Sequence, residues 1–217
     1  GLNVLVTSGP TREPIDPVRF ISNSSSGKQG FALAQAAQEA GANVTLVSGP
    51  VTIKTPSDVR RIDVLTASEM KSAVAAELEN TDIFVGVAAV SDYRPTDRHE
   101  KKIKKHETRG SDLIVGLTEN PDILEAAAAN NPRPYIVGFA AETHDTLLHA
   151  REKLERKSCD AIIVNDVSDP KIGFDSDNNA VTLIHTSGET FFPFESKSKI
   201  AIKLVTAISE LYKKQAL

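Results

Sequence analysis

The sequence predicts an α/β fold with a doubly wound, mostly parallel β-sheet and helices on both of its faces. Two observations lead to this prediction. Short apolar runs rich in β-branched residues alternate along the chain with segments of helical apolar spacing, and this alternation is typical of a parallel sheet covered on both sides. The irregular segments fall where the predicted strands end. In such sheets, ligands bind in the crevice at the carboxyl ends of the strands.

The first predicted strands and helix follow from the N-terminal residues. Residues 2–10, LNVLVTSGP, are a β-branched run that closes with Ser-Gly-Pro, which indicates a buried strand followed by a turn. Residues 27–42 place apolar side chains at helical spacing, and Gly41 ends the helix. A second strand is expected at 42–50, which again closes with Ser-Gly-Pro.

The remaining elements repeat this order. Residues 66–80 begin with Thr66 and carry Glu69 three residues later, which is the capping box of a helix start. Residues 81–93 are expected to form a strand that runs into a loop. An asparagine cap followed by proline begins a helix at 120–131. For the rest of the chain the pattern predicts strands at 133–143 and 159–168, helices at 146–158 and 198–214, and a hairpin at 178–195.

Length and composition are typical of one globular domain. The chain has 217 residues, 40% of them apolar, so we expect a single core and a single domain over residues 1–217. The net charge of −4 does not favour a nucleic-acid partner. The single cysteine, Cys159, excludes an internal disulfide and a cysteine-based zinc site. Because no apolar run reaches membrane-spanning length and the N-terminal one is too short for a signal peptide, we expect a soluble, cytoplasmic protein without a membrane partner.

Residues 22–30, SNSSSGKQG, look like half of a phosphate-binding loop. A Walker A loop would need glycine at 22 and a hydroxyl side chain at 29, where the chain has serine and glutamine. The dinucleotide fingerprint also fails, because the first turn has one glycine and the next glycine pair comes ~18 residues later. Two interpretations remain. The turn either offers backbone amides, hydroxyls and a positive helix end to an anion, or Ser25 or Ser26 simply caps the helix.

Three further features each allow a functional and a structural interpretation. Residues 11–23 either form a surface loop with ion pairs or present Asn23 to a ligand. Asp92, just past a strand end, either meets a sugar hydroxyl or a metal, or caps a turn. Lys153 and Lys157 lie four residues apart on one helix face, as ordinary solvent-facing lysines or as ligand contacts.

Residues 94–110 are a polar, basic stretch inside an otherwise compact chain. A loop of that length is usually a lid or a binding loop. Its centre, KKIKK at 101–105, has four lysines in five residues. This run is either a solvated charge cluster or a set of cations that a lid brings to a polyphosphate.

Several kinds of site are not indicated. Residues 175–179, DSDNN, do not continue as an EF-hand loop, which would need glycine at 180 and glutamate at 186. The five histidines have no metal-like spacing, and there is no G-x-S-x-G nucleophile elbow. Amides, hydroxyls and lysines remain, and these suit binding and phosphate-centred chemistry.

Long motifs in the same order along the chain resemble one family. They are TSGPTREPIDPVRFISNSSSGKQG, VAAVSDYRP, KKIKK, ENPDIL, VGFAAET, IIVNDVS and GFDSDNNA. Over essentially its whole length the chain is similar to bacterial phosphopantothenoylcysteine synthetase, also called phosphopantothenate–cysteine ligase, of coenzyme A biosynthesis. The resemblance implies a Rossmann-like sheet with a β-hairpin extension and a lysine-rich lid loop.

The resemblance also implies a reaction that uses CTP, with Mg²⁺ accompanying the triphosphate. The carboxylate of 4′-phosphopantothenate attacks the α-phosphate to give an acyl-cytidylate and pyrophosphate. The amine of L-cysteine then attacks the activated carbonyl, forming the amide and releasing CMP. Both steps build negative charge on oxygen atoms, so preorganised donors and cations are the natural catalysts. Relatives that use ATP exist, so the sequence leaves the choice of nucleotide open.

The site residues of the family carry over by motif. Asn23 matches the asparagine that contacts the acyl-cytidylate, and Lys102 matches the lysine needed to form it. Ser25, Ser26 and Gly27 would cradle a phosphate, either of the nucleotide or of phosphopantothenate. The other implied nucleotide contacts are Gly86, Val87, Ala88, Asp92, Pro121, Asp122, Ile123, Leu124, Phe139, Lys153 and Lys157.

Further implications concern partners. The resemblance implies a homodimer in which parts of each site come from the partner subunit, with residues 94–110 as a lid over the substrate. In most bacteria this domain is the C-terminal half of a bifunctional protein and is fused to a flavin-dependent phosphopantothenoylcysteine decarboxylase.

Two other classes of function fit the same kind of sheet. A nicotinamide-dependent reductase would need a glycine-rich first turn and an acid after the second strand, which instead ends in Ser-Gly-Pro at 48–50. A non-catalytic nucleotide-binding module would explain the loops, but not a lysine lid beside an asparagine at the phosphate site.

Overall fold

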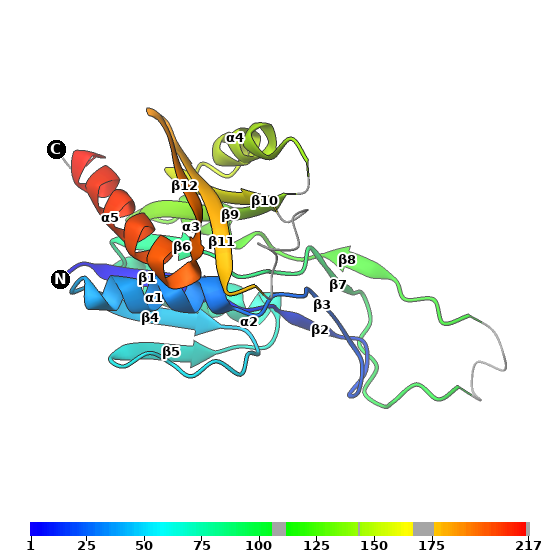
Figure 1. Ribbon diagram of the computed structural model, residues 1–217. Coiled ribbons are helices and arrows are strands. Elements are labelled where there is room, and N and C mark those ends of the chain that lie inside the picture. The colour runs from blue at the N-terminus through cyan, green and yellow to red at the C-terminus, as the bar shows by residue number, and fades with distance from the viewer. Residues whose placement is uncertain (106–111, 143, 167–175, 216–217) are drawn as a thin grey trace.

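An eight-stranded sheet forms the centre of the molecule (Figure 1). The computed structural model describes residues 1–105, 112–142, 144–166 and 176–215. In spatial order the strands are β12 (Gly188–Ser196), β11 (Asn178–His185), β10 (Ala161–Asp166), β9 (Tyr135–Glu142), β6 (Ile83–Gly86), β1 (Asn3–Ser8), β4 (Asn43–Ser48) and β5 (Val59–Asp63).

The strands from β5 to β10 are all parallel, and β11 and β12 add an antiparallel hairpin at one edge. Counted along the chain, the parallel strands lie in the order 3-2-1-4-5-6, and the direction of connection reverses between β1 and β6. The predicted Rossmann-like sheet with a hairpin extension is therefore confirmed. The reversal leaves a crevice outside the carboxyl ends of β1 and β6, where such sheets bind ligands.

One strand of the sheet was not predicted. The sequence pattern predicts no element between residues 50 and 66, whereas β5 pairs with β4 in that interval. The sequence of β5, VRRID, contains two arginines and no fully buried residue. Since β5 has a neighbour on one side only, it does not need the continuous apolar run that marks the interior strands.

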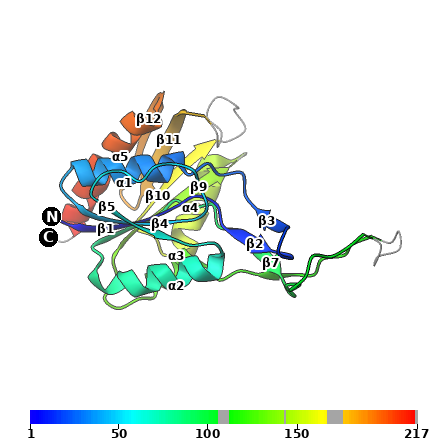
Figure 2. The same ribbon diagram turned by 90° about the horizontal axis from the view of Figure 1, so that it is seen from below.

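Helices cover both faces of the sheet (Figure 2). One apolar cluster, which includes Phe31 and Leu204, packs under α1 and α5. A second cluster, which includes Met70 and Leu154, packs under α2, α3 and α4. Within the described ranges, no helix has the length and apolar character to cross a membrane. The helices are α1 (Lys28–Glu39), α2 (Ala67–Glu77), the 3₁₀ turn η1 (Leu78–Asn80), α3 (Ile123–Ala128), α4 (Thr146–Arg156) and α5 (Lys197–Gln215).

Two short antiparallel ribbons lie outside the sheet, and the described residues between the strands of the second, 96–105 and 112–116, project from the body (Figures 1 and 2). We call residues 93–105 and 112–119 the arm. The predicted lid, 94–110, forms its outgoing side, as far as the described residues extend. Closure of this segment over a ligand stays a prediction. The ribbons pair β2 (Arg12–Pro14) with β3 (Phe20–Ser22), and β7 (Tyr93–Pro95) with β8 (Leu117–Glu119).

Candidate active site

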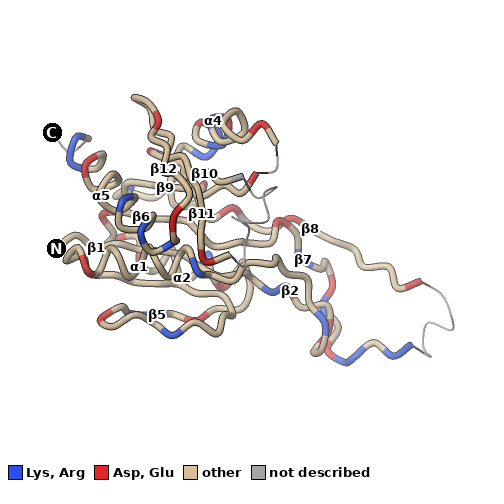
Figure 3. Tube along the Cα trace, viewed as in Figure 1, with Lys and Arg blue, Asp and Glu red and all other residues tan. Residues whose placement is uncertain are grey.

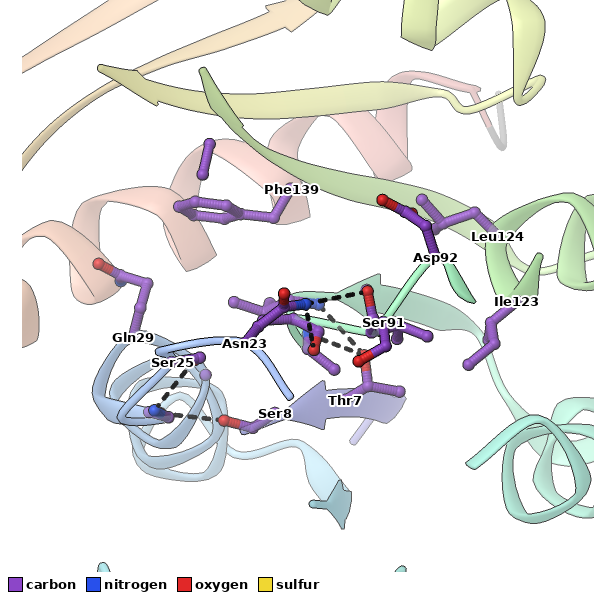
Figure 4. A pocket seen from close by; sticks show the side chains of 18 of the residues that line it. Thr7, Ser8, Asn23, Ser25, Gln29, Ser91, Asp92, Ile123, Leu124 and Phe139 are labelled. Carbon is purple, nitrogen blue, oxygen red and sulfur yellow. Dashed lines mark hydrogen bonds between the residues drawn. The ribbon is translucent and has the colours of Figure 1, made fainter. Parts of the chain in front are cut away.

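A cleft of about 970 Å³ opens at the carboxyl ends of the central strands. It lies beside the reversal between β1 and β6, where the fold predicts a ligand site. Figure 4 shows Ser25 and Gln29 on one side of it, Asp92 and Ile123 on the other, and Asn23 between them. All of the predicted site residues except Lys102 line this cleft, namely Asn23, Ser25, Ser26, Gly27, Gly86, Val87, Ala88, Asp92, Pro121, Asp122, Ile123, Leu124, Phe139, Lys153 and Lys157.

The serine-rich turn leaves the start of α1 open to the cleft. Gly27 is the N-cap of α1, with φ of 80°, and no side-chain hydrogen bond caps the helix there. The alternative of a cap by Ser25 or Ser26 is therefore wrong. Ser25 Oγ instead accepts from the Gly27 N–H at 3.3 Å, and Ser8 Oγ donates to the Gly27 carbonyl at 2.9 Å. The N-cap residue thus adds no side chain between the cleft and the positive end of the helix dipole, which suits an anion.

Gly30 lets α1 approach β1 closely. A Cβ atom at Gly30 would lie 2.3 Å from Ser8 Oγ and 2.6 Å from Ser8 Cβ. In the dinucleotide fingerprint, the third glycine allows this same close packing of helix on strand. The fingerprint fails as a sequence pattern because β2 and β3 are inserted between the first turn and α1.

Asn23 is fixed to the loop that follows β6. Its Nδ2 donates to the carbonyls of Ala89 and Val90, at 3.1 and 3.2 Å. Thr7 Oγ1 accepts from the Val87 N–H at 3.2 Å and so holds the beginning of the same loop. The interpretation that residues 11–23 present Asn23 to a ligand agrees with this geometry, because the carboxamide is held in a set orientation at the cleft.

The start of α3 is set by Asp122. Its side chain is the N-cap and accepts from the Glu125 N–H at 2.8 Å. The predicted asparagine cap is wrong, because the Asn120 Nδ2 donates to the Ser91 carbonyl at 2.8 Å instead. The helix is correspondingly shorter than the predicted 120–131.

Lys153 in α4 and Lys157, the residue that follows this helix, both line the cleft, so they are not merely solvent-facing lysines. Lys153 Nζ donates to the Phe139 carbonyl at 3.1 Å, and burial lowers the pKa of its ammonium group. Lys157 Nζ lies 2.8 Å from the Asp122 carboxylate, which raises the pKa of Lys157. For Asp122, desolvation acts to raise the pKa, but hydrogen bonds from the Glu125 N–H and from Lys157 outweigh it, and the pKa is lowered. Two lysines one helical turn apart suit the phosphates of a nucleotide.

Three buried amide side chains of the cleft were not predicted. Gln29, Asn165 and Asn179 are each less than a tenth exposed. The Ala180 N–H donates to Asn179 Oδ1 at 3.0 Å, which fixes this oxygen as an acceptor. Asn165 Nδ2 therefore donates to it, at 3.2 Å, and Asn179 Nδ2 donates to Gln29 Oε1 at 3.1 Å.

The direction of these hydrogen bonds leaves two atoms unsatisfied. Gln29 Nε2 and Asn165 Oδ1 have no hydrogen-bond partner among the described residues. Both atoms are buried, and a buried polar group without a partner costs about 1–3 kcal/mol. The available sequence signal was that both asparagines fall inside the quoted motifs IIVNDVS and GFDSDNNA.

Lys102 lies apart from these residues. Its side chain is exposed on the arm and does not line the cleft of its own chain. Figure 3 shows lysine and arginine concentrated along the outgoing side of the arm. The structure thus separates the two predicted catalytic residues, Asn23 and Lys102, within one chain.

Two histidines approach each other at the start of α4. The ligand atoms of His144, Asp145 and His149 lie within 4.8 Å of one another. The histidines have no metal-like spacing along the sequence, but these two lie close together in the fold. These side chains are exposed or half-buried and do not line the cleft, so we assign them no part in its chemistry.

Comparison with known proteins agrees with the fold. Residues 1–212 match the family described as the DNA/pantothenate metabolism flavoprotein C-terminal domain. The chain belongs to this family. It is 51% identical over 212 residues to the Coenzyme A biosynthesis bifunctional protein CoaBC of Escherichia coli strain K12, which covers 97% of this chain and 52% of that protein. The protein of the same name from Vibrio cholerae is 51% identical over 212 residues, covering 97% of this chain and 53% of the relative.

A solved member of the family has the same fold along its length. It is described as the C-terminal domain of the Coenzyme A biosynthesis bifunctional protein CoaBC, is 34% identical and superposes with a TM-score of 0.83. The match covers 99% of this chain and 97% of that one. The chain thus spans about half the length of the curated relatives it matches, and the predicted family resemblance is confirmed.

Proposed function

We propose that this domain joins 4′-phosphopantothenate and L-cysteine into 4′-phosphopantothenoylcysteine, consuming CTP and releasing pyrophosphate and CMP. The observation that carries the proposal is the cleft itself, in which the open start of α1, Asn23 and two lysines face one space. Membership of the family supports the assignment, since its bifunctional relatives are named for coenzyme A biosynthesis.

In the first step, a carboxylate oxygen of phosphopantothenate forms a bond to the α-phosphorus of CTP, and the bond to the departing pyrophosphate breaks. Negative charge accumulates on the phosphate oxygens. The amides of α1 and the ammonium groups of Lys153 and Lys157 line the cleft and would stabilise this charge. Lys102 would add a further cation where the arm of one subunit reaches the cleft of the other.

In the second step, the cysteine nitrogen bonds to the acyl carbon, the acyl–oxygen bond breaks, CMP leaves and the nitrogen releases a proton. Charge now develops on the carbonyl oxygen. Asn23 is a neutral carboxamide held by two hydrogen bonds, so it would contact the acyl-cytidylate without moving. A protein nucleophile is not needed, in agreement with the missing nucleophile elbow.

Mg²⁺ fits this cleft as an ion carried by the nucleotide. Of the acids that line the cleft, Asp122 and Glu125 already form ion pairs with Lys157, whereas Asp92 and Glu119 are exposed. Since Mg²⁺ keeps most of its ligands from phosphates and water, Asp92 would hold it directly or through water. The bound ion would neutralise charge on the triphosphate.

A homodimer would explain the position of Lys102. Large apolar side chains are exposed on the arm and on the neighbouring ribbon, including Ile114, which is 89% exposed, and Val18, Phe20 and Leu117. Exposed apolar groups that gather on one side of a molecule mark an interaction surface. A second copy of the chain would cover them, and each arm would then bring Lys102 to the cleft of its partner.

The relatives are about twice as long as the part that this chain matches, which supports a natural protein with a further domain. Because the chain matches about half of bifunctional proteins, we propose that the domain works fused to a flavin-dependent decarboxylase that uses the ligase product. We expect both activities in the cytoplasm.

Neither alternative class accounts for the cleft as well. A reductase would need an acid after β4, which ends instead in Ser48, a residue with no exposed surface. A non-catalytic module would bind nucleotide without releasing pyrophosphate.

The test is release of pyrophosphate with Mg²⁺, 4′-phosphopantothenate and either CTP or ATP, with and without cysteine. The proposal expects release that requires phosphopantothenate, turns over with cysteine and is faster with CTP. Tight nucleotide binding without any release would instead assign a binding module.

A further inference from the structure

Asp16 lies in the turn between β2 and β3 and is 2% exposed. Its Oδ1 accepts from the N–H groups of Val18 and Arg19, both at 2.8 Å. Its Oδ2 accepts from Arg19 Nε at 3.0 Å and from the Ile103 N–H at 3.2 Å. Arg19 Nη2 also donates to the Ile103 carbonyl at 2.7 Å. Asp16 and Arg19 together therefore hold both peptide groups of Ile103, a residue of the arm.

The peptide held by Asp16 is the one that joins Lys102 to Ile103. A third hydrogen bond runs alongside, from the His99 N–H to the Ile15 carbonyl at 2.9 Å. The backbone on either side of Lys102 is thus tied to the β2–β3 turn, while the Lys102 side chain stays exposed.

The charge of Asp16 strengthens this link. Desolvation acts to raise the pKa of its carboxyl, but hydrogen bonds from Val18, Arg19 and Ile103 outweigh it and hold the pKa well below its usual range. The side chain is therefore a carboxylate at neutral pH, and hydrogen bonds to a charged acceptor are stronger than those to a neutral one. Asparagine has the same shape and can keep the Oδ1 bonds of the turn, but it has no second oxygen for the Ile103 N–H.

We propose that Asp16 is a positioning residue, which fixes the arm so that the adjacent Lys102 reaches a nucleotide phosphate in one defined place. Asp16 does not line the cleft, so it acts through Lys102. The inference rests on the proposed ligase function, because it takes Lys102 as the cation of the first step.

The experiment compares the wild type with Asp16→Asn and with a matched control, Glu13→Gln. Glu13 is also 2% exposed and belongs to the same ribbon, but it accepts from the Ala67 N–H, at 2.9 Å, at the start of α2 and not from the arm. Two readouts are taken, the rate of trypsin cleavage after the lysines of 101–105 and the rate of pyrophosphate release with CTP and phosphopantothenate.

For Asp16→Asn we expect cleavage about tenfold faster and pyrophosphate release about tenfold slower, because the substitution removes the charged acceptor of the Ile103 N–H and of Arg19 Nε. The KM for CTP should not change, and combining Asp16→Asn with Lys102→Gln should add no further loss. Glu13→Gln should lower the melting temperature while both rates stay near those of the wild type.

Wild-type cleavage and release in Asp16→Asn would overturn the proposal. Equal losses in both variants, in proportion to their melting temperatures, would also overturn it, since Asp16 would then only stabilise the fold. If the wild type itself releases no pyrophosphate, the ligase function fails. The cleavage rates then decide alone, and an unchanged rate in Asp16→Asn excludes Asp16 as the residue that holds the arm.

Discussion

The cleft and the arm hold their functional groups in different ways. In the cleft, Asn23 is bonded to two carbonyls of the loop after β6, and that loop is in turn bonded to Thr7 at the end of β1. On the arm, Lys102 is exposed, and the backbone beside it is held at Ile103 by a turn that belongs to another segment. The difference indicates two tasks. In the proposed reaction, the cleft would bind and orient the reactants at the edge of the sheet, and the arm would add a positive charge from outside.

The largest effect is expected from a substitution at Lys102. Lys102→Gln removes a cation that is proposed to stabilise the transition state, so pyrophosphate release should slow about 100-fold, the usual cost of one electrostatic group. Lys102 does not line the cleft of its own chain. Nucleotide affinity, measured by calorimetry, should change little. Lys101→Gln, the exposed neighbour, is the matched control and should retain most activity. A wild-type rate in Lys102→Gln would place the needed cation elsewhere.

Asn23 tests the other half of the comparison. Asn23→Asp should still release pyrophosphate once per site, but cysteine-dependent turnover should fall about 10- to 100-fold, because a carboxylate repels the developing oxyanion. Rapid-quench measurement of the two steps separates these rates, with Ser24→Ala as the control. Full cysteine-dependent turnover would remove Asn23 from the mechanism.

Gly30 tests whether the cleft depends on close packing of α1 against β1. Gly30→Ala places a Cβ atom 2.3 Å from Ser8 Oγ, so the free energy of unfolding should fall by about 1–3 kcal/mol, the usual cost of overpacking. Urea unfolding measures this change. In the arm, Gly116→Ala meets Thr96 Oγ1 at an ordinary 3.6 Å and should be nearly neutral. Equal effects at the two glycines would contradict the proposed rigidity of the cleft.

Asp122 should give the smallest effect, seen in the pH dependence of stability. Its pKa is lowered in the fold, so its contribution is present above its unfolded pKa and is lost as the pH falls through the folded value. Asp122→Asn should reduce the free energy of unfolding at pH 7 by less than about 1 kcal/mol, since the pair with Lys157 is partly exposed. The difference from wild type should shrink below about pH 4. A difference that grows as the pH falls would contradict the lowered pKa of Asp122.

Local sequence patterns predicted most of the sheet but not its polar edge strand β5. Interior strands such as β1 and β10 are apolar and β-branched, so their period and their turns identify them. The polar edge strand β5 has no such run. Asn120 carries the sequence signal of a helix cap, but its side chain bonds to Ser91 instead, and Asp122 takes the cap. Tertiary contacts therefore decided where α3 begins.

The site was predicted as far as the family motifs extend. Fifteen of the residues that those motifs identified line one cleft. The motifs did not indicate that Gln29 and Asn179, which are 150 positions apart, form a hydrogen bond there. Nor did they link Asp16 to Ile103, 87 positions away. Such pairs depend on the packed fold, and no local spacing encodes them.

The most direct measurement identifies the nucleotide products of a single turnover with CTP, phosphopantothenate and cysteine. Attack on the α-phosphate, which the cleft is proposed to promote, predicts CMP and pyrophosphate in equal amounts. It also predicts an acyl-cytidylate, detectable by mass spectrometry when cysteine is withheld. Formation of CDP and inorganic phosphate, through an acyl phosphate, would contradict the proposed chemistry of the cleft.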